Sequence, residues 1–583
     1  MAVAFHIAQF LEDHFQKVAS SLEGFGDGFT ADVRPTEPRF GVFQANGVLP
    51  YAKKTKQNPR ALAQTLLDAL QLPTDHFTAE IAGPGFININ LTPAFYADWL
   101  KTFKDEAALQ QGASHIDEGL NVVVDYSSPN TAKQMHVGHL RSMVIGEAIQ
   151  RLLRFCGANV TRDNHIGDWG TQFGILIMAI KDAGYNLDEE HPNLLEELEA
   201  LYKAGTQKTK DDPAALEQAR NELVKLQQGD AENMQLWEKI NSLSYEAFES
   251  IYKLFNVAFD CVLGESFYRD KVDRIYKELE ETKLSEESQG ALVVFHPEHP
   301  RFAKQPFIIR KSDGATNYAT TDLATALHRL EAFEANEMIN VTDGRQQDHF
   351  EQLRLTVEKW FAAKGYKPCK LRHVWFGTIL GEDGKAIKTR SGEPIKLKEL
   401  VSEAVERAYK VVAEKSPELT EDEKREIAEK VGIGAVRYAD LSQNRTSDYT
   451  FSWEKMLSFD GNTAPYLLYA TARLHAIFRK AGLKPGEGED AATSFETETE
   501  LALARKLVLF PSVLELTLED LRPHFLCTYL FELSGIFSSF YNADKVVTED
   551  PGTQARRLML CARTLNTLET GLKLLGIETL ERM

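Results

Sequence analysis

Cysteine is scarce in this chain, and long apolar runs are missing. The five cysteines, at positions 156, 261, 369, 527 and 561 of 583 residues, show no paired spacing. This argues against a disulfide scaffold and against a cysteine-based zinc site. No stretch approaches the roughly 18 consecutive apolar residues of a membrane span, and the first residues lack the basic start and cleavage site of a secretion signal. The sequence therefore predicts a protein of the reducing cytoplasm without a membrane anchor.

An excess of positive charge is also missing. The 66 basic and 86 acidic residues give a net charge of −20, which excludes a polycation that coats nucleic acid through bulk charge. A nucleic-acid enzyme with local basic patches stays open. Hydrophobic residues make up 43% of the chain and charged residues 26%, the composition of globular domains rather than of disordered segments. The length predicts about three or four domains.

The first region, residues 1–115, is predicted to form a small α+β domain. A helix is expected from Ala4 to Val18 and another from Pro59, and the alternating apolar residues of 86–91 indicate a strand. A local basic cluster lies between them. We favour a solvated face for it over a contact with an RNA backbone. Its members are Lys53, Lys54, Lys56 and Arg60.

The rest of the chain is predicted to be α/β and then helical. Residues 116–400 alternate strands and helices, which predicts a Rossmann-like parallel sheet, and a charged helical insertion interrupts them at about 185–290. The apolar run at 306–310 is expected to resume the alternation. A helical connector at 401–459 and a helical bundle at 460–583 follow. The predicted fold is a multidomain α/β protein.

The motif His136-Val137-Gly138-His139 stands between a predicted buried strand and a predicted helix. Helix N-termini at the carboxyl ends of parallel strands favour phosphate groups, and a glycine lets a flat base lie against the backbone. Taken alone, four residues would be interpreted as two capping histidines. The strand–loop–helix context favours a nucleotide site. A zinc site of the HEXXH kind is not expected, because no glutamate accompanies the histidines.

A resemblance follows from this motif and its flanks. VDYSSPNTAKQMHVGHLRSMVIGEA and NHIGDWGTQFG resemble the arginyl-tRNA synthetases of the bacterial type, which are class I aminoacyl-tRNA synthetases. FGVFQANG, AGPGFININL, NYATTDLA, DGRQQDHF and LSFDGNTAPYLLYATARL extend the resemblance along nearly the whole chain. Val42 and Phe43 depart from the acid and tyrosine that relatives often carry in the first of these segments.

The resemblance implies a two-step reaction and its substrates. The carboxylate of L-arginine would attack the α-phosphate of ATP, in the presence of Mg²⁺, and the resulting adenylate would acylate the terminal adenosine of tRNA(Arg). The protein would work as a monomer without a metal site of its own. Lys133, His136 and His139 would be catalytic, with Lys133 beside the α-phosphate, and Gly138 and both histidines would bind ATP.

The second signature of the family, a lysine-rich loop, is degenerate here. The candidate loop is 384–392, in which Thr389 takes the place of the usual second lysine. The resemblance implies that Lys133 takes over that role. Lys385, Lys388 and Arg390 would contact ATP through its pyrophosphate, whereas an ordinary surface hairpin is the alternative interpretation.

Arginine recognition requires carboxylates, because a guanidinium is planar and permanently charged. By resemblance, Asp125 and Asp322 would meet the guanidinium, with Tyr318 packing nearby; Tyr318 and Asp322 are four residues apart, so one helix face can present both. Asn130 and Gln346 would bind the main-chain groups of arginine. Ser127 is a further candidate. A cap or a surface charge is the alternative for each acid.

Further residues have alternative interpretations. Asp168 and Trp169 would line the adenosine site or shape a turn, with a structural role favoured for Trp169. A stripe in the last region would stack on anticodon bases or belong to the core; it comprises Tyr466, Tyr469 and Arg473. Contacts with tRNA phosphates are considered for Arg437, Arg445 and Lys455.

Three other protein classes compete with the family named above. A cysteinyl-tRNA synthetase would require cysteine and histidine ligands for zinc. A nucleotidyltransferase with an HxGH motif would not explain the helical bundle. A non-catalytic RNA-binding paralogue would not need the intact HVGH motif together with Lys133, Asp125 and Asp322.

Overall fold

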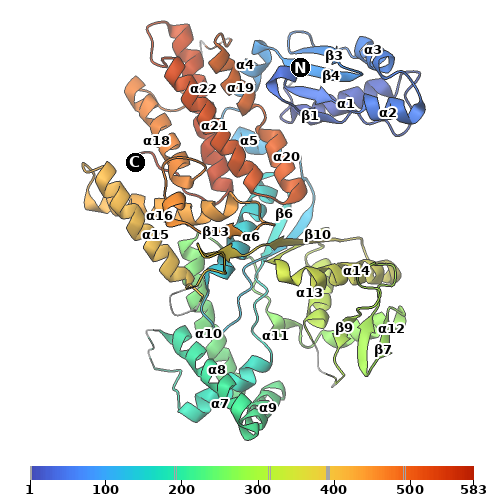
Figure 1. Ribbon diagram of the computed structural model, residues 1–583, viewed down its shortest axis with the longest axis vertical. Coiled ribbons are helices and arrows are strands. Elements are labelled where there is room, and N and C mark those ends of the chain that lie inside the picture. The colour runs from blue at the N-terminus through green and yellow to red at the C-terminus, as the bar shows by residue number, and fades with distance from the viewer. Residues whose placement is uncertain are drawn as a thin grey trace.

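A computed structural model describes residues 3–583 except 190, 192, 313, 315, 316, 389–393, 490, 491 and 493. A central sheet separates two groups of elements along the long axis of the molecule (Figure 1). The N-terminal domain and the C-terminal helices lie above the sheet in that view, and the helical insertion and a small lobe lie below it. The predicted multidomain α/β fold is confirmed.

The N-terminal domain is built on an antiparallel sheet of strand order β1-β2-β4-β3. Its strands are β1 Val33–Pro35, β2 Phe43–Ala45, β3 Phe77–Ala82 and β4 Phe86–Leu91, and its helices are α1 Ile7–Ala19, α2 Val48–Thr55, α3 Pro59–Ala69 and the short η1 Pro38–Phe40. Asn58 starts α3 because its side chain accepts the backbone N–H groups of Arg60 and Ala61. The expected helices and strand are therefore present.

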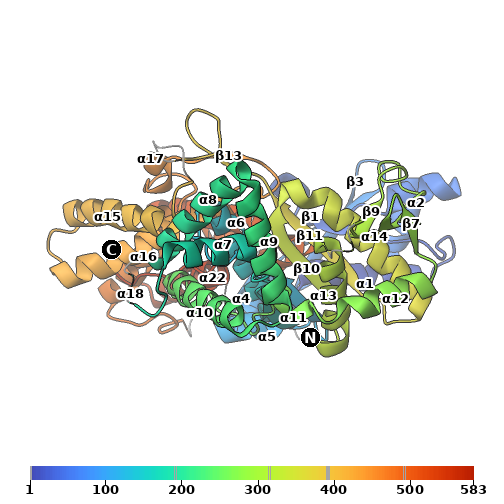
Figure 2. The same cartoon turned by 90° about the horizontal axis from the view of Figure 1, so that it is seen from below.

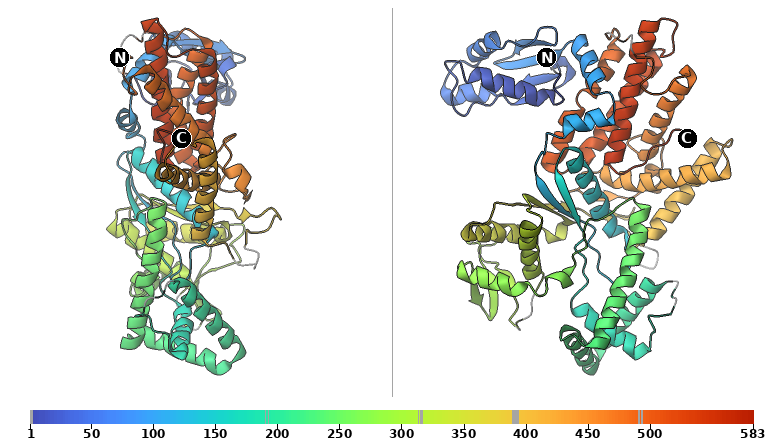
Figure 3. Two further views of the ribbon diagram at one scale, coloured as in Figure 1. Left: turned by 90° about the vertical axis from the view of Figure 1, so that its left-hand side faces the viewer. Right: turned by 180° about the vertical axis from the view of Figure 1, so that it is seen from behind.

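Two helices join this domain to the rest of the molecule. They are α4 Pro93–Thr102 and α5 Glu106–Ala113. Helix α4 packs on α19 Glu498–Leu507, and α5 packs on α22 Pro551–Leu574. The view from behind shows the N-terminal domain beside the C-terminal helices in consequence (Figure 3).

In the described part of the chain the central sheet has four parallel strands in the order β11-β10-β5-β6. They are β5 Asn121–Asp125, β6 Asn159–Asp163, β10 Glu337–Asp343 and β11 Lys370–Phe376. Val122, Val123 and Val124 are all buried, as expected for a strand with both faces covered. Helix α6 Val137–Phe155 connects β5 to β6, and α14 Gln347–Lys364 connects β10 to β11 through η2 Gly344–Gln346.

The apolar run at 306–310 does not join the parallel sheet, contrary to the expectation. It forms β9 Phe307–Arg310, which pairs in a separate antiparallel sheet with β8 Ala291–Val294, itself paired with β7 Ser285–Ser288. Phe307 and Ile309 are buried, whereas Ile308 is 44% exposed. One face of this strand therefore meets solvent. The sheet forms the small lobe with α12 Val272–Glu281, α13 Tyr318–Ala332 and α14.

The insertion is helical, and it lies between α15 Leu397–Lys415 and the small lobe when the molecule is seen from below (Figure 2). Its helices are α7 Thr171–Ala183, α8 Leu194–Asp211, α9 Pro213–Gln227, α10 Ala231–Leu254 and the short α11 Glu265–Tyr268. Phe173, Leu198, Leu226 and Ile240 share a hydrophobic cluster of their own. Helix α7 precedes residue 185 but packs on α8 and α9.

The C-terminal region is helical, as predicted. It consists of α15, α16 Glu421–Leu441, α17 Trp453–Met456, α18 Ala464–Ala481, α19, α20 Phe510–Asp520, α21 His524–Ala543 and α22, and a small sheet pairs β12 Ile379–Leu380 with β13 Tyr449–Thr450.

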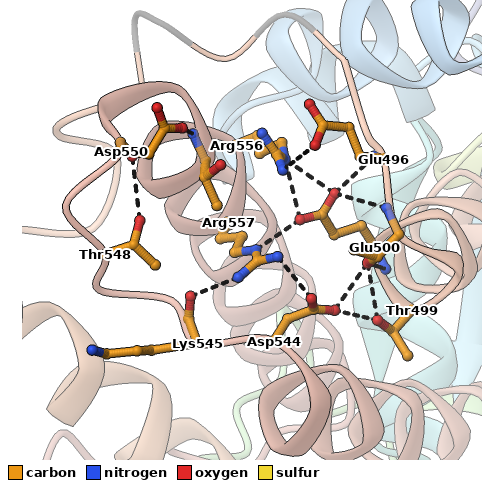
Figure 4. Close-up of polar contacts among 11 residues, drawn as sticks. Glu496, Thr499, Glu500, Asp544, Lys545, Thr548, Asp550, Arg556 and Arg557 are labelled. Carbon is orange, nitrogen blue, oxygen red and sulfur yellow. Dashed lines mark hydrogen bonds and ion pairs between the residues drawn. The ribbon is translucent and has the colours of Figure 1, made fainter.

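A buried ionic network holds three segments of this region together (Figure 4). The Glu500 carboxylate on α19 accepts from Arg556, at 3.1 Å, and from Arg557, at 2.7 Å, both on α22. Arg557 also pairs with Asp544, just after α21, at 2.7 Å. Glu500 further closes the first turn of α19 through a capping box with Thr497. The Glu500 carboxylate thus fixes the start of α19 and joins α19 to α22, and Arg557 links this pair to the end of α21.

Candidate active site

The loop between β5 and α6 is fixed by side chains from three other elements. The backbone N–H of Ser127 donates to Ser142 Oγ at 2.9 Å, that of Ser128 to Asn164 Oδ1 at 3.0 Å, and that of Ala132 to Ser244 Oγ at 3.0 Å. These residues have positive φ angles of 71°, 46° and 61°, which L-residues adopt only with external support. The loop is therefore held in one shape before any ligand arrives.

His136 and His139 cap the helix that they begin. His136 Nδ1 accepts the N–H of Gly138 at 3.0 Å, and His139 Nδ1 accepts the N–H of His136 at 3.1 Å. The two rings lie 4.1 Å apart between their centroids. Burial lowers the pKa of His136, and burial together with His136 lowers the pKa of His139 to about 3. Both rings are therefore neutral at physiological pH.

The capping bonds decide which nitrogen carries the proton. A neutral imidazole that accepts at Nδ1 is protonated at Nε2. Each histidine therefore offers an Nε2–H donor to a ligand while its Nδ1 holds the helix start, so that the capping and the nucleotide interpretations apply together. A Cβ at Gly138 would stand 2.7 Å from His136 Cε1, which explains the glycine between the histidines.

The lysine-rich loop returns to the same segment. Val137 donates its N–H to Ile395 O at 2.9 Å, and Leu397 donates to Met135 O at 3.0 Å. Lys385 and Lys388 are exposed on the loop before this contact. Thr389 and Arg390 lie outside the described residues. The base of the loop is thus joined to the start of α6, where the nucleotide is expected.

Asp125 has an internal partner that the sequence did not reveal. Its Oδ2 accepts from Arg329 at 2.8 Å and from Asn340 at 3.0 Å, and its Oδ1 accepts from Ser128 at 2.8 Å. Burial alone would raise the pKa of this carboxyl, but Arg329 keeps it below its usual value. Arg329 also binds Asp163 at 2.7 Å. Asp125 thus meets a guanidinium of the chain itself, and its contact with substrate arginine stays a prediction.

Asp322, by contrast, lies on α13 in a group of acids whose other members are Glu265 and Asp168. Its Oδ2 lies 2.5 Å from His349 Nε2. Burial opposes protonation of His349, but the hydrogen bond and charge of Asp322 raise its pKa above the usual value. Tyr318, one turn earlier on α13, is 72% exposed. Tyr318 and Asp322 are therefore both on α13, as expected, and His349 is a partner of Asp322; their contact with arginine stays a prediction.

Glu265 is the acid that the sequence analysis missed. It starts α11, and burial, followed by the charges of Asp322 and Asp168, raises the pKa of its carboxyl to about 8. Within the described ranges, Glu265 has no ion-pair partner. A carboxyl with a raised pKa and no ion-pair partner is stabilised in its ionised form when a cation binds beside it. Its only sequence signal was its place in GESF, within the predicted helical insertion.

The two residues expected to bind the main chain of arginine lie at carboxyl ends of strands. Asn130 is exposed and forms a bridge with Gly167; a Cβ at Gly167 would stand 1.9 Å from Asn130 Oδ1. Gln346 is exposed at the end of η2, after β10. Ser127 differs from them, because it is buried and its hydroxyl lies 2.9 Å from Tyr252 Oη. These roles remain predictions.

Asp168 and Trp169 have structural contacts. Asp168 accepts from the backbone N–H of Ser266 at 2.9 Å and from its hydroxyl at 2.6 Å, and this fixes the start of α11. Trp169 packs edge-on against Trp237, and the Arg269 guanidinium lies 4.9 Å from its ring. The structural role favoured for Trp169 fits these contacts.

Two arginines considered for tRNA phosphates are buried, so that expectation was wrong for them. Arg437 donates to Phe255 O at 2.6 Å, and Arg445 donates to the carbonyl oxygens of Trp375 and Leu521. Lys455 is exposed. The stripe on α18 is mixed: Tyr466 packs on Phe531, the Arg473 guanidinium lies over Tyr541, and Tyr469 is exposed.

Comparisons with known proteins agree with this architecture. The catalytic-domain model of "tRNA synthetases class I (R)" matches residues 105–453, the arginyl-tRNA synthetase N-terminal domain matches residues 6–91, and the DALR anticodon binding domain matches residues 467–583. The chain belongs to the arginyl-tRNA synthetase family. The resemblance seen in the sequence is therefore confirmed, and the rival enzyme classes are set aside.

The similar proteins and solved structures match this synthetase over nearly its full length. An arginine–tRNA ligase of Laribacter hongkongensis is 44% identical over 99% of the chain and all of the relative, and one of Pseudoalteromonas translucida is 44% identical over 95% and 97%. The arginyl-tRNA synthetase of Plasmodium falciparum superposes with a TM-score of 0.85 at 29% identity, covering 100% of both chains, and that of Thermus thermophilus with 0.82 at 26%, covering 99% and 100%.

Proposed function

We propose that the region between the start of α6 and the start of α11 is where this synthetase forms arginyl-adenylate. A carboxylate oxygen of L-arginine attacks the α-phosphorus of ATP, and pyrophosphate leaves. The 2′-hydroxyl of the terminal adenosine of tRNA(Arg) then attacks the carbonyl carbon of the adenylate, and AMP leaves. Negative charge grows on the phosphate oxygens in the first step, so fixed donors and cations there lower the barrier.

The ATP half of the site is the start of α6. His136 and His139 each present an Nε2–H donor from a ring held by a capping bond, and the positive end of the α6 dipole adds favourable charge. Lys133 supplies the cation beside the α-phosphate. Lys385 and Lys388 reach the pyrophosphate from the loop that is joined to this segment. Mg²⁺ would enter on the phosphates of ATP.

The arginine half of the site is the acid group of Glu265 and Asp322, with Tyr318 beside them. The observation that carries this assignment is Glu265, a partly buried carboxyl with a raised pKa that lacks an ion-pair partner among the described residues. A guanidinium can donate to two carboxylates at once, whereas the ammonium of lysine loses the bidentate match. Asn130 and Gln346 are proposed to bind the α-amino and carboxylate groups.

The experiment that tests the proposal is ATP–pyrophosphate exchange, measured with and without tRNA. Lys133→Ala should reduce exchange at least tenfold while the fold is retained, because a cation beside the reacting phosphate is lost. Lys210→Ala, which removes an exposed lysine of α8, is the matched control and should exchange normally. Near-normal exchange by Lys133→Ala would show that the lysine has another role.

The proposal also covers the cellular location, the oligomeric state and the macromolecular partner. The described helices include none that is both long and apolar enough to cross a membrane. We propose that the synthetase works in the cytoplasm as a monomer with tRNA(Arg) as its macromolecular partner. Size-exclusion chromatography with light scattering, with and without tRNA, measures the stoichiometry directly.

A further inference from the structure

One side of the insertion helix α8 faces the proposed ATP site. Glu196 pairs with Lys396 at 3.0 Å, and the backbone of Lys396 forms a bridge with His136. One turn further along α8, Glu199 lies close enough for its charge to oppose the lowering of the His136 pKa by burial. Another three residues on, the ring of Tyr202 lies over Lys133, with Nζ 5.2 Å from the ring centroid.

Lys133 has few other constraints. Among the residues that the structure describes, its ammonium forms no ion pair and no hydrogen bond with a side chain. Its charge nevertheless contributes to lowering the pKa of both His136 and His139, so it lies near the two imidazoles. The aromatic ring of Tyr202 is therefore the group that defines where this flexible side chain rests.

We propose that Tyr202 is a positioning residue for adenylate formation, whose ring holds the Lys133 ammonium beside the two imidazoles. This inference rests on the role of Lys133 in the proposed function. A cation within about 6 Å of a ring centroid is attracted by the negative face of the ring. A lysine has a long stem with several rotatable bonds, so a partner that restrains it raises the fraction of molecules that are ready to react.

The position of Tyr202 gives the insertion a part in the reaction. Helix α8 packs on α7, α9 and α10 within the insertion, and its polar contacts with the catalytic domain include the Glu196–Lys396 ion pair and the Tyr202 ring over Lys133. Tyr202 also contributes to the raised pKa of Tyr318, behind burial, Glu265 and Asp322. Tyr202 is therefore near Tyr318 of the arginine half as well as over Lys133 of the ATP half.

Two substitutions at this position test the inference. Tyr202→Leu removes the aromatic face, and Tyr202→Phe keeps it without the hydroxyl. The rate constant of adenylate formation, measured by rapid quench with tRNA present, should fall roughly three- to tenfold in Tyr202→Leu and stay within about twofold of the parent in Tyr202→Phe. The KM for arginine should be unchanged in both. A Tyr202→Leu rate equal to the parent, or a Tyr202→Phe rate as low as that of Tyr202→Leu, would overturn the inference.

A tyrosine elsewhere in the insertion provides the matched control. Tyr185 stacks on His191 with a centroid distance of 4.5 Å and donates to Glu197. Tyr185→Leu should leave the rate constant of adenylate formation as it is in the parent. An equal loss in Tyr185→Leu would mean that any disturbance of the insertion slows the reaction, and the specific role of Tyr202 would fall.

Lys133→Met separates this inference from the proposed function on which it rests. A near-normal rate in Lys133→Met refutes the role of Lys133 itself. If Lys133→Met is slow and Tyr202→Leu is normal, only the inference on Tyr202 fails. In the double variant, Tyr202→Leu should add no further loss, because the group that it positions is already gone. A full additional loss would show that Tyr202 acts on another group.

Discussion

The raised pKa of Glu265 leads us to expect that arginine binding depends on pH. Glu265 has a pKa of about 8, raised first by burial and then by Asp322 and Asp168. Its carboxyl is therefore mostly protonated at neutral pH. A guanidinium stabilises the ionised form, so bound arginine lowers the pKa of this carboxyl and its binding releases a proton. The affinity for arginine should consequently rise with pH and level off once Glu265 is ionised in the free protein.

The size of the effect follows from the pKa of Glu265. At pH 7 only about one carboxyl in ten is ionised, and at pH 9 about nine in ten are. If the bound form stays ionised throughout, the affinity should increase about tenfold over this range, which corresponds to ~1.4 kcal/mol. At pH 7, binding should release close to one proton per arginine.

Isothermal titration calorimetry can measure both quantities. Arginine is titrated at pH 7, 8 and 9, in two buffers with different enthalpies of ionisation, so that the proton count is obtained separately from the affinity. Glu265→Gln is the control: it should bind arginine more weakly at pH 9 and lose most of the dependence on pH. The remaining slope belongs to His349, whose pKa Asp322 raises against the effect of burial, and to the α-amino group of arginine itself, which loses its proton towards pH 9. An affinity of the parent protein that is constant from pH 7 to 9, or an unchanged slope in Glu265→Gln, would refute this reasoning.

Three further predictions concern buried polar contacts. Glu500→Ala leaves Arg556 and Arg557 without their carboxylate and should lower the free energy of unfolding of the C-terminal helices by about 3–5 kcal/mol; an unchanged urea midpoint would contradict it. Arg329→Met should cost a similar ~3–5 kcal/mol in the catalytic domain, because it strands two buried aspartates, as circular dichroism during urea unfolding can show. Tyr449→Phe removes the bond from Tyr449 Oη to Asp440, 3.1 Å long, and should cost about 1 kcal/mol without changing the KM for arginine in the exchange assay.

Local elements were largely predictable from the sequence. The start of α3 follows from Asn58 and Pro59, whose cap and ring belong at the first turn of a helix. The buried strand β5 follows from a run of three valines, and α6 follows from the apolar spacing after the histidine motif. Each of these features depends on neighbours within a few residues, so periodicity and capping suffice to place them.

Partners from distant parts of the chain were not predictable in the same way. The run that forms β9 is too short to show which sheet it joins, and only its exposed Ile308 reveals a strand with one face in solvent. Arg437 and Arg445 look like surface cations in the sequence. In the structure they are buried and donate to backbone carbonyl oxygens of segments more than 60 residues away, a use that long arginine side chains allow.

Partners from distant parts of the chain also explain why the sequence analysis singled out Asp125 and did not single out Glu265. Asp125 stands at the end of a central strand, the position where ligands bind in open α/β sheets, but Arg329 supplies its cation from α13, 204 residues along the chain. Glu265 stands within the insertion on a helix of four residues, where no strand pattern marks it. Charge balance separates the two acids: the site around Asp125 already contains a guanidinium, whereas the site around Glu265, Asp322 and Asp168 has only His349 as a cationic partner among the described residues. A site that needs one more cation to become neutral is suited to a substrate that brings a permanent positive charge, as arginine does.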